Sequence, residues 1–394
     1  CMSSVSESVD EIIESLCKSK NVLLYGPPGT GKTWLISKVK EKIQSTMAVP
    51  AIVPGKFTSV PSKPLTGSLP SYISVEWVTF HQSYTYEEFI IGKRPKPKGS
   101  GIVLQPYLGI LMSLAFELDG ASSDKGYLLI IDEINRANAS QVFGELITLL
   151  DPDYRATKDH KDNSSAVKIR LPGISYTGGI SEPIMSLKQA TPIHLPEDWV
   201  FPENVFILAT MNSADKAALP LDSALTRRFH KIEMPPDLSV LAGLLDVKLP
   251  EVAKKVSNIR SAKVVDPSDL SAEEATVLIL DRVNYHVAQD IGEDFELGHA
   301  LFSGVVKASP GERFEALAVA WDNIVWPQLL ERYAGRPEEL KTLLKVESGS
   351  GTSPAFFERV RLGTKAESDA PLTITKLKSL DPGNAKLVLQ ALSL

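Results

Sequence analysis

The sequence has little cysteine, no long apolar run and no excess of positive charge, and each shortage excludes a class of protein. Two cysteines in 394 residues cannot form a disulfide framework, and so low a number is typical of a reducing compartment. No apolar stretch approaches the roughly 20 residues that span a bilayer, and no basic segment followed by an apolar one marks export. We therefore expect a cytoplasmic protein without a membrane segment.

The charge balance argues against nucleic-acid binding driven by net charge alone. Lysine and arginine together number 42 against 48 aspartates and glutamates, which gives a formal charge of −6 at pH 7. Hydrophobic residues make up 43% and charged residues 23%, which are ordinary proportions for a globular protein. The length leaves room for two or three domains with a sizeable buried core.

Short apolar runs alternate with helical patterns along the N-terminal part of the chain. The runs at 21–25, 127–131 and 205–209 predict buried strands, and the pattern at 32–43 predicts a helix. Apolar strands separated by helices favour a parallel sheet covered on both faces, so the predicted fold class is α/β with three αβα layers. After Phe229 the patterns become helical, which predicts a separate helical domain.

A glycine-rich loop joins the first predicted strand to the first predicted helix, and its sequence GPPGTGKT fits the pattern G-x-x-x-x-G-K-S/T. The loop consists of Gly26, Pro27, Pro28, Gly29, Thr30, Gly31, Lys32 and Thr33. Its glycines let backbone amides at a helix N-terminus approach a β-phosphate. Lys32 would reach the β- and γ-phosphates, and the Thr33 hydroxyl would ligate Mg²⁺. The sequence therefore predicts a site for a nucleoside triphosphate.

Two adjacent carboxylates, Asp132 and Glu133, follow the apolar strand 127–131. They are expected at the carboxyl edge of the sheet, where α/β proteins bind ligands. Asp132 would hold the magnesium ion or one of its waters, and Glu133 would orient and deprotonate the water that attacks the γ-phosphate. Asn212, at the end of another predicted strand, could bridge that water and the γ-phosphate, although asparagine at a strand end is also a common turn former.

Arg227 and Arg228 end a short helical segment that begins at Pro220. Their guanidinium groups would be suited to stabilising transition-state charge on the nucleotide of a neighbouring subunit. The alternative is that both are solvated partners of a helix dipole. The two interpretations predict different effects of removing the side chains on turnover.

Four segments in this order resemble a AAA+ ATPase core, namely GPPGTGKT, IIDEINRA, ATMNSADKA and LDSALTRRF. The chain is more closely similar to the McrB-like branch, the nucleotide-hydrolysing motor subunits of modified-cytosine-dependent restriction systems. That similarity extends to FHQSYTYEEFIIGKRP (80–95), FELGHALF (295–302) and VWPQLLERY (325–333). It covers roughly residues 20–335, most of the chain.

The resemblance implies a ring, a hexamer in the McrB-like branch, with nucleotide between subunits. It makes Asn212 the residue that senses the γ-phosphate. Arg227 or Arg228 would be the arginine finger that acts on the nucleotide of a neighbouring subunit, and Mg²⁺ would lie at Thr33 and Asp132. It implies an McrC-like endonuclease on a separate chain, with DNA reached through that partner or through another domain. McrB-like motors favour GTP whereas most AAA+ relatives use ATP, so both nucleotides stay open and GTP is preferred.

The domains expected from these patterns are a leader helix at 1–20, a nucleotide-binding core at 21–233, a helical lid at 234–346, and a linker and tail at 347–394. One departure from the family pattern is Lys216, where arginine usually follows the N-x-x-D signature; lysine keeps the charge but loses the bidentate fork. Two alternatives remain open, a MoxR-like ATPase that remodels proteins and a nucleotide-gated assembly scaffold with little turnover.

A cluster of four cations, Lys93, Arg94, Lys96 and Lys98, alternates with prolines and precedes a glycine. This composition predicts a solvated basic loop on the surface. In a ring the same loop could contact DNA phosphates or the nuclease instead. His299, in the FELGHALF segment, is expected to be a packing or hydrogen-bonding residue and not a metal ligand.

Overall fold

The computed structural model describes most of the chain. The described residues are 2–46, 51–53, 56–58, 69–118, 124–156, 166–189, 191–215, 219–261, 269–344, 357–359, 372–374 and 382–393. The chain divides into two compact units. The sheet unit comprises Met2–Tyr25 and Lys32–Glu233, and the helical unit comprises Gly26–Gly31 and Met234–Leu394. Lys216 lies outside the described residues, and so does most of the linker and tail predicted at 347–394.

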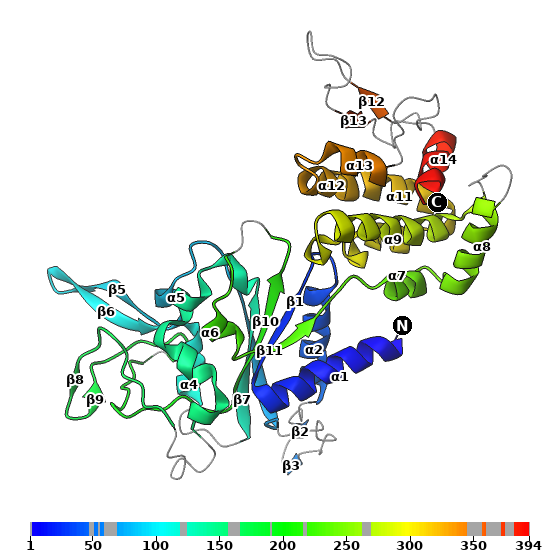
Figure 1. Ribbon diagram of the computed structural model, residues 1–394. Helices are drawn as coiled ribbons and strands as arrows, with labels where there is room; N and C mark the ends of the chain where they lie inside the picture. Colours follow the sequence, from blue (N-terminus) through cyan, green and yellow to red (C-terminus); the bar gives the residue numbers. More distant parts are fainter. Residues whose placement is uncertain are drawn as a thin grey trace, which may run out of the picture. The chain divides into compact units, whose positions relative to one another are not determined.

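A five-stranded sheet forms the centre of the sheet unit (Figure 1). Its strand order is β11 (His230–Glu233), β1 (Asn21–Gly26), β10 (Val205–Asn212), β7 (Lys125–Asp132) and β4 (Tyr72–Thr79). The pairs β1–β11, β10–β7 and β4–β7 are parallel. Most residues of β1, β7 and β10 are buried, because apolar side chains project from both faces of each strand. The predicted α/β fold with a covered parallel sheet is confirmed.

Helices cover both faces of this sheet. Figure 1 shows α1 (Met2–Ser19) and α2 (Lys32–Thr46) on one side, and α4 (Ile110–Glu117) and α5 (Ala139–Phe143) on the other. The short α3 (Tyr86–Phe89) begins with a capping box, since the Thr85 amide donates to the Glu88 carboxylate at 2.9 Å.

The register of the sheet decides which residues meet at its carboxyl edge. Ala209 pairs with Ile131 between β10 and β7, and Thr79 of β4 pairs with Asp132. Thr210, which follows Ala209, therefore comes level with Asp132. The residues that end β7 and β10 consequently lie side by side.

The segment predicted as a basic loop is a strand, which corrects that prediction. β5 (Ile91–Lys98) pairs antiparallel with β6 (Gly101–Leu108), and Gly99 at the turn has a positive φ of 59°. β6 pairs with one edge of β5, so Pro95 and Pro97 can sit in β5 with their missing amides on the other edge and without removing a ladder bond. The stretch after Asp151 contains a second, shorter hairpin, β8 (Tyr176–Thr177) and β9 (Ile180–Ser181).

The helical unit is built around α9 (Ala272–Asp290), which begins with a capping box formed by Ser271 and Glu274. Its apolar residues form one buried cluster with those of the surrounding helices. These are α7 (Leu238–Leu244), α10 (Ser303–Lys307), α11 (Arg313–Ala320), α12 (Trp326–Arg332), α13 (Pro337–Leu343) and α14 (Pro382–Ser393). The buried apolar residues of α8 (Leu249–Ser261) form a second, smaller cluster with Leu270. None of the helices among the described residues is both long and apolar enough to cross a bilayer.

A proline and a glycine in this unit have particular backbone settings. A π-helical turn at Trp321–Val325 connects α11 to α12, and Pro327 lies in the first turn of α12, where its missing amide costs little. Gly292, which follows α9, has φ 128° and ψ 153°, a conformation that only glycine tolerates.

The remaining elements are short. They are β2 (Ala51–Val53), β3 (Lys56–Thr58), α6 (Ser223–Thr226), β12 (Phe357–Arg359), β13 (Leu372–Ile374), and the 3₁₀ turns Ile134–Arg136, Gly144–Leu150, Pro152–Tyr154, Glu293–Phe295, His299–Phe302 and Pro310–Glu312.

Candidate functional site

The glycine-rich loop leaves the end of β1 and leads into α2, as the phosphate-binding pattern requires. Gly29 and Gly31 have φ values of 79° and 87°, a region open to glycine at little cost. The buried hydroxyl of Thr30 donates to the carbonyl of Pro27 at 3.1 Å and so closes the loop on itself. The loop backbone therefore has a curved shape that side chains at Gly29 or Gly31 would strain.

Lys32 is the first residue of α2 and is only 6% exposed. Burial lowers the pKa of its ammonium group to about 8, and the carboxylates of Asp132 and Glu133 oppose that shift. An incoming polyanion such as a triphosphate would stabilise the charged form of this partly desolvated ammonium group. Thr33, the next residue, is exposed.

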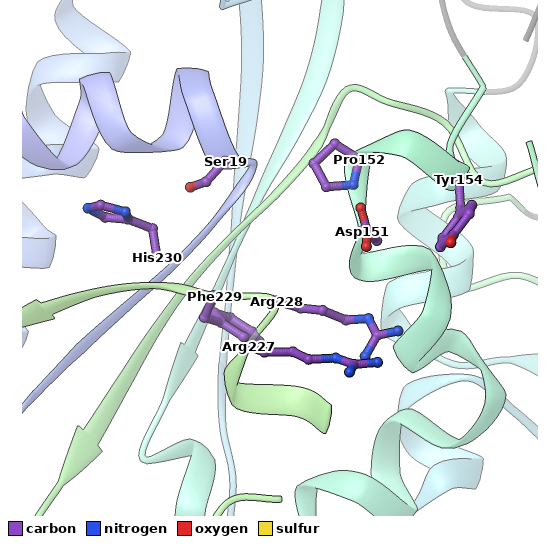
Figure 2. Close-up of a pocket in the computed structure, with 8 residues that line it drawn as sticks. All are labelled: Ser19, Asp151, Pro152, Tyr154, Arg227, Arg228, Phe229 and His230. Atoms are coloured by element: carbon purple, nitrogen blue, oxygen red, sulfur yellow. The ribbon is translucent and has the colours of Figure 1, made fainter. Parts of the chain in front are cut away.

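Arg227 and Arg228 follow α6 and line a pocket of about 500 Å³ in the sheet unit. Figure 2 shows both side chains extending in the same direction from the end of that helix. Arg227 is exposed, whereas Arg228 is half-buried and its Nη1 donates to the carbonyl of Ala224 at 2.6 Å. The side chain of Arg228 thus has a role within its own chain, and Arg227 is the more available of the two.

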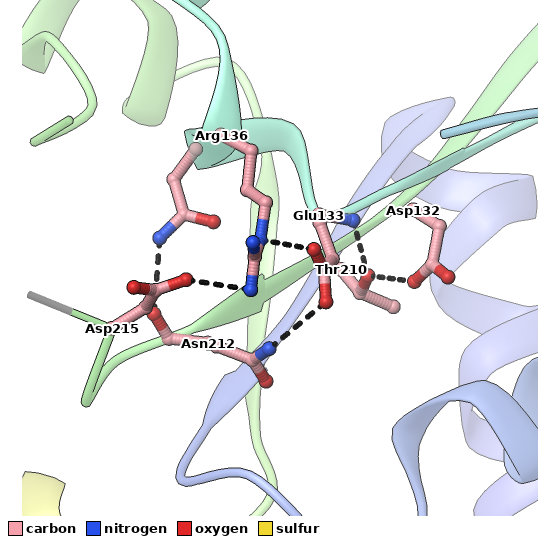
Figure 3. A network of polar contacts seen from close by, with 7 residues as sticks. Asp132, Glu133, Arg136, Thr210, Asn212 and Asp215 are labelled. Atoms are coloured by element: carbon pink, nitrogen blue, oxygen red, sulfur yellow. Dashed lines mark hydrogen bonds and ion pairs between the residues drawn. The ribbon is translucent and has the colours of Figure 1, made fainter. Parts of the chain in front are cut away.

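A threonine absent from the sequence-based predictions links the two carboxylates that follow β7. The Thr210 hydroxyl donates to Asp132 Oδ1 at 2.5 Å and accepts the backbone N–H of Glu133 at 2.9 Å (Figure 3). This pair of bonds fixes the end of β7 against β10. Asp132 is half-buried, and its carboxylate, like the Thr33 hydroxyl, supplies the oxygen ligands that Mg²⁺ prefers, so both residues fit a magnesium ion.

Glu133 has a left-handed backbone, with φ 55° and ψ 50°. Residues other than glycine adopt this conformation rarely, and strain of this kind is concentrated at functional sites. Its carboxylate accepts a hydrogen bond from Asn212 Nδ2 at 3.3 Å and forms an ion pair with Arg136 (Figure 3). Arg136 Nη2 in turn contacts Asp215 at 2.9 Å. The glutamate is therefore held from two sides.

The structure thus brings together Asp132, Glu133 and Asn212, the three predicted residues at the sheet edge. Thr210 and Arg136 are not among the residues predicted from the sequence, although both lie inside the segments that carried the resemblance. Their signals were weak, because a threonine in a strand and an arginine in a turn are common. Only the strand register places Thr210 opposite Asp132.

The basic residues of β5 lie largely on one face of the β5–β6 hairpin. Cross-strand partners share a face, so Arg94, Lys96 and Lys98 project together and Pro95 and Pro97 project to the other side. The prolines share their face with Ile102 and Leu104, which are 75% and 63% exposed. The hairpin therefore has one basic face and one apolar face.

Two families match the chain. Residues 69–229 match the AAA domain of the dynein-related subfamily, and residues 275–341 match the alpha-helical lid domain of McrB. The first match includes Asp132, Glu133 and Asn212 at the sheet edge and also the two adjacent arginines. The second runs from within α9 to within α13 of the helical unit.

Two curated proteins are similar to the chain. It is 28% identical over 298 residues to the EcoKMcrB subunit of the type IV methyl-directed restriction enzyme of Escherichia coli, which covers 75% of this chain and 50% of that protein. It is 29% identical over 238 residues to YdiS, a component of the type II restriction enzyme BsuMI of Bacillus subtilis. That alignment covers 53% of this chain and 55% of YdiS. The chain spans about half the length of these relatives.

Among solved structures, a mutant of RuvB from Thermotoga maritima aligns with 89% of this chain and 90% of its own, at 14% identity and a TM-score of 0.34.

Proposed function

Because this chain belongs to the McrB-like branch of the AAA+ proteins, we propose that it is a magnesium-dependent nucleoside triphosphatase that drives a partner endonuclease in DNA restriction. We further propose that the chain assembles into a ring, which the resemblance to the McrB-like branch implies is a hexamer. GTP would be favoured over ATP as the substrate. Its endonuclease partner would be an McrC-like chain, and DNA would be reached through that partner or another domain.

The observation that carries this proposal is the arrangement at the carboxyl edge of the sheet. Asp132 and Glu133 have adjacent positions but different partners, since the first is bonded to Thr210 and the second to Asn212 and Arg136. Two carboxylates held differently are suited to two tasks. In phosphoryl transfer those tasks are to bind the metal ion and to handle the attacking water.

Each residue has a part in the proposed hydrolysis. The amides of Gly26–Gly31 and the Lys32 ammonium group would bind the phosphates, and Thr33 and Asp132 would hold Mg²⁺. When bound, Mg²⁺ neutralises charge on the β- and γ-phosphate oxygens. Glu133 would accept a proton from the attacking water, and Asn212 would orient that water toward the γ-phosphorus. The bonds from Asn212 and Arg136 to Glu133 fix the direction of the accepting carboxylate.

The exposed Arg227 is the proposed finger that reaches the nucleotide of a neighbouring subunit. A guanidinium group supplied in trans stabilises the charge that develops on the γ-phosphate. Arg228 would instead hold the end of α6 through its bond to Ala224.

The test is steady-state hydrolysis of GTP and ATP, with and without magnesium and the partner nuclease, together with the mass of the assembly. Lys32→Ala should lose nucleotide binding, and Glu133→Gln should bind nucleotide without turning it over. Glu197→Gln, at an exposed carboxylate paired with Arg170, is the matched control and should behave as the unmodified chain.

Retained hydrolysis in Glu133→Gln would remove Glu133 from the role of base. Monomeric behaviour with every nucleotide would contradict the ring. Hydrolysis that proceeds normally while no nuclease co-purifies would favour a remodelling ATPase over a restriction motor, and binding without turnover would favour a scaffold.

A further inference from the structure

A short segment of the helical unit, Gly298–Ala300, lies against the glycine-rich loop of the same unit. The Gly298 amide donates to the carbonyl of Pro28 at 3.2 Å, and the Ala300 amide donates to the carbonyl of Gly29 at 2.8 Å. A Cβ on Gly298 would lie 1.9 Å from the carbonyl carbon of Gly29. The two backbones therefore approach each other more closely than any side chain at 298 would allow.

This contact sets the position of His299, the residue between the two amides. Its Nε2 lies 3.9 Å from the place that a Cβ on Gly31 would take and is the atom nearest to that place. Gly31 immediately precedes Lys32 in the loop. The imidazole Nε2 is thus close to the part of the loop whose amides are expected to surround phosphate oxygens.

The tautomer of His299 follows from its other nitrogen. Nδ1 receives the backbone N–H of Asp237 at 3.2 Å. An amide N–H can only donate, so Nδ1 must be unprotonated, and a neutral ring then carries its proton on Nε2. The nitrogen that faces the loop is therefore a hydrogen-bond donor.

The surroundings of the ring also favour its neutral form. Burial lowers the pKa of His299 below its ordinary value, and the Asp237 carboxylate opposes that shift. The same carboxylate accepts hydrogen bonds from Ser239 and from the amide of Val240 at the start of α7. Asp237 is therefore engaged with the helix it caps, and its backbone amide orients the imidazole.

We propose that His299 donates the Nε2–H bond to a phosphate oxygen of the nucleotide held by the loop. The proposal rests on the proposed function, because it requires a nucleotide in the loop Gly26–Thr33. It adds a phosphate-binding residue from the helical unit, in a segment that the triphosphatase motifs do not include. The ligand chemistry is the phosphate chain, not the base or the ribose.

The experiment compares the variants His299→Ala, His299→Gln and His286→Ala with the unmodified chain. Glutamine can place an amide N–H close to where Nε2 lies, whereas alanine removes the donor. His286 is on α9 with its ring against Tyr285, and it is the matched control. Calorimetry measures the affinity for GTP, ATP and inorganic tripolyphosphate, each with magnesium.

His299→Ala should weaken all three ligands by about tenfold or more, as expected for the loss of a hydrogen bond to a charged group. His299→Gln should recover most of that loss, and His286→Ala should change nothing. In ¹⁵N-histidine spectra, the ring of residue 299 should show the Nε2–H tautomer, and its Nε2 signal should shift when ligand is added.

Three results would overturn the proposal. The first is unchanged affinity in His299→Ala. The second is a loss for GTP and ATP but not for tripolyphosphate, which would place the contact on the base or ribose. The third is an equal loss of affinity in His299→Ala and His299→Gln together with an Nε2 signal that does not shift when ligand is added. That result would leave His299 only a packing role. If Lys32→Ala binds as well as the unmodified chain, or if neither binds, the proposed function itself fails.

Discussion

Arg136 forms an ion pair with Glu133, three residues before it, while a second nitrogen of the same guanidinium contacts Asp215. The pair lies in a tight turn, because Glu133 has a left-handed backbone and a 3₁₀ turn follows it at Ile134–Arg136. Asn212 contacts the same carboxylate from β10. The direction of the proposed base thus depends on a cation that the chain supplies itself.

Replacing Arg136 should lower turnover more than it lowers nucleotide affinity. In Arg136→Gln the carboxylate loses its charged partner and is held by Asn212 alone, so the base is less well directed at the water. We expect kcat to fall on the order of tenfold or more with little change in the Kd for nucleotide. Arg170→Gln, at an exposed arginine paired with Glu197, is the control. An equal fall in kcat and affinity would contradict a positioning role.

Thr210→Val tests the link between Asp132 and Glu133. Valine has nearly the same shape, but it leaves the Asp132 carboxylate and the Glu133 amide without their shared partner. We expect a loss of about 1–3 kcal/mol in the free energy of unfolding, measured with urea, and weaker activation by magnesium. Thr276→Val is the matched control: it is also buried and loses only a bond to the carbonyl of its own helix at Ala272, so it should cost less.

The lowered pKa of Lys32 predicts proton uptake on nucleotide binding. Its ammonium group is charged below about pH 8, and a triphosphate favours the charged form, so affinity should fall as pH rises above 8. Calorimetry at pH 8.5 in two buffers of different ionisation enthalpy should show uptake of about half a proton or more. The absence of proton uptake would mean that nucleotide binding does not protonate Lys32.

Lys32 also gives a stability prediction whose sign is opposite to that for affinity. The unfolded lysine titrates near its ordinary value of 10.5, above the folded pKa of about 8. Between these values the unfolded chain binds more protons, so the contribution of Lys32 to stability should rise with pH in this window. Lys32→Met should flatten that part of the pH profile of urea unfolding.

Mixing two inactive variants tests whether Arg227 acts in trans. Arg227→Ala should bind nucleotide but lose turnover, and Glu133→Gln should do the same for a different reason. In mixed rings some interfaces combine an intact Glu133 with an intact Arg227, so part of the turnover should return. Arg228→Ala, whose side chain bonds to Ala224, should mainly lower stability. Mixtures that stay inactive would contradict a finger supplied by the neighbour.

The local parts of this protein could be predicted from the sequence, and the parts set by strand pairing could not. The glycine-rich loop and the capping boxes at Thr85 and Ser271 depend on residues within a few positions of one another. Asp132 and Asn212 could be placed at the sheet edge because each ends an apolar run. Thr210 could not be paired with Asp132, since that requires the register between β7 and β10.

The β5–β6 hairpin shows why composition misled at one point. Pro95 and Pro97 argue against a strand because proline cannot donate to a ladder, and the cations between them suggest a solvated loop. In this hairpin that objection disappears, because β6 pairs with one edge of β5 and the prolines can direct their missing amides to the other edge. Likewise, the FELGHALF segment gave no sign that His299 faces the glycine-rich loop, because that contact joins residues about 270 positions apart.

Gly298→Ala provides the sharpest structural test of the contact between Gly298–Ala300 and the loop. The added Cβ would meet the carbonyl carbon and oxygen of Gly29 at 1.9 and 2.0 Å, and both are backbone atoms that cannot rotate away. We expect a loss of about 1–3 kcal/mol in stability, together with weaker nucleotide binding, because the segment must move off the loop. Gly304→Ala is the control, since a Cβ there meets nothing within 4 Å. Equal behaviour of the two variants in urea unfolding and calorimetry would show that Gly298 does not hold the loop.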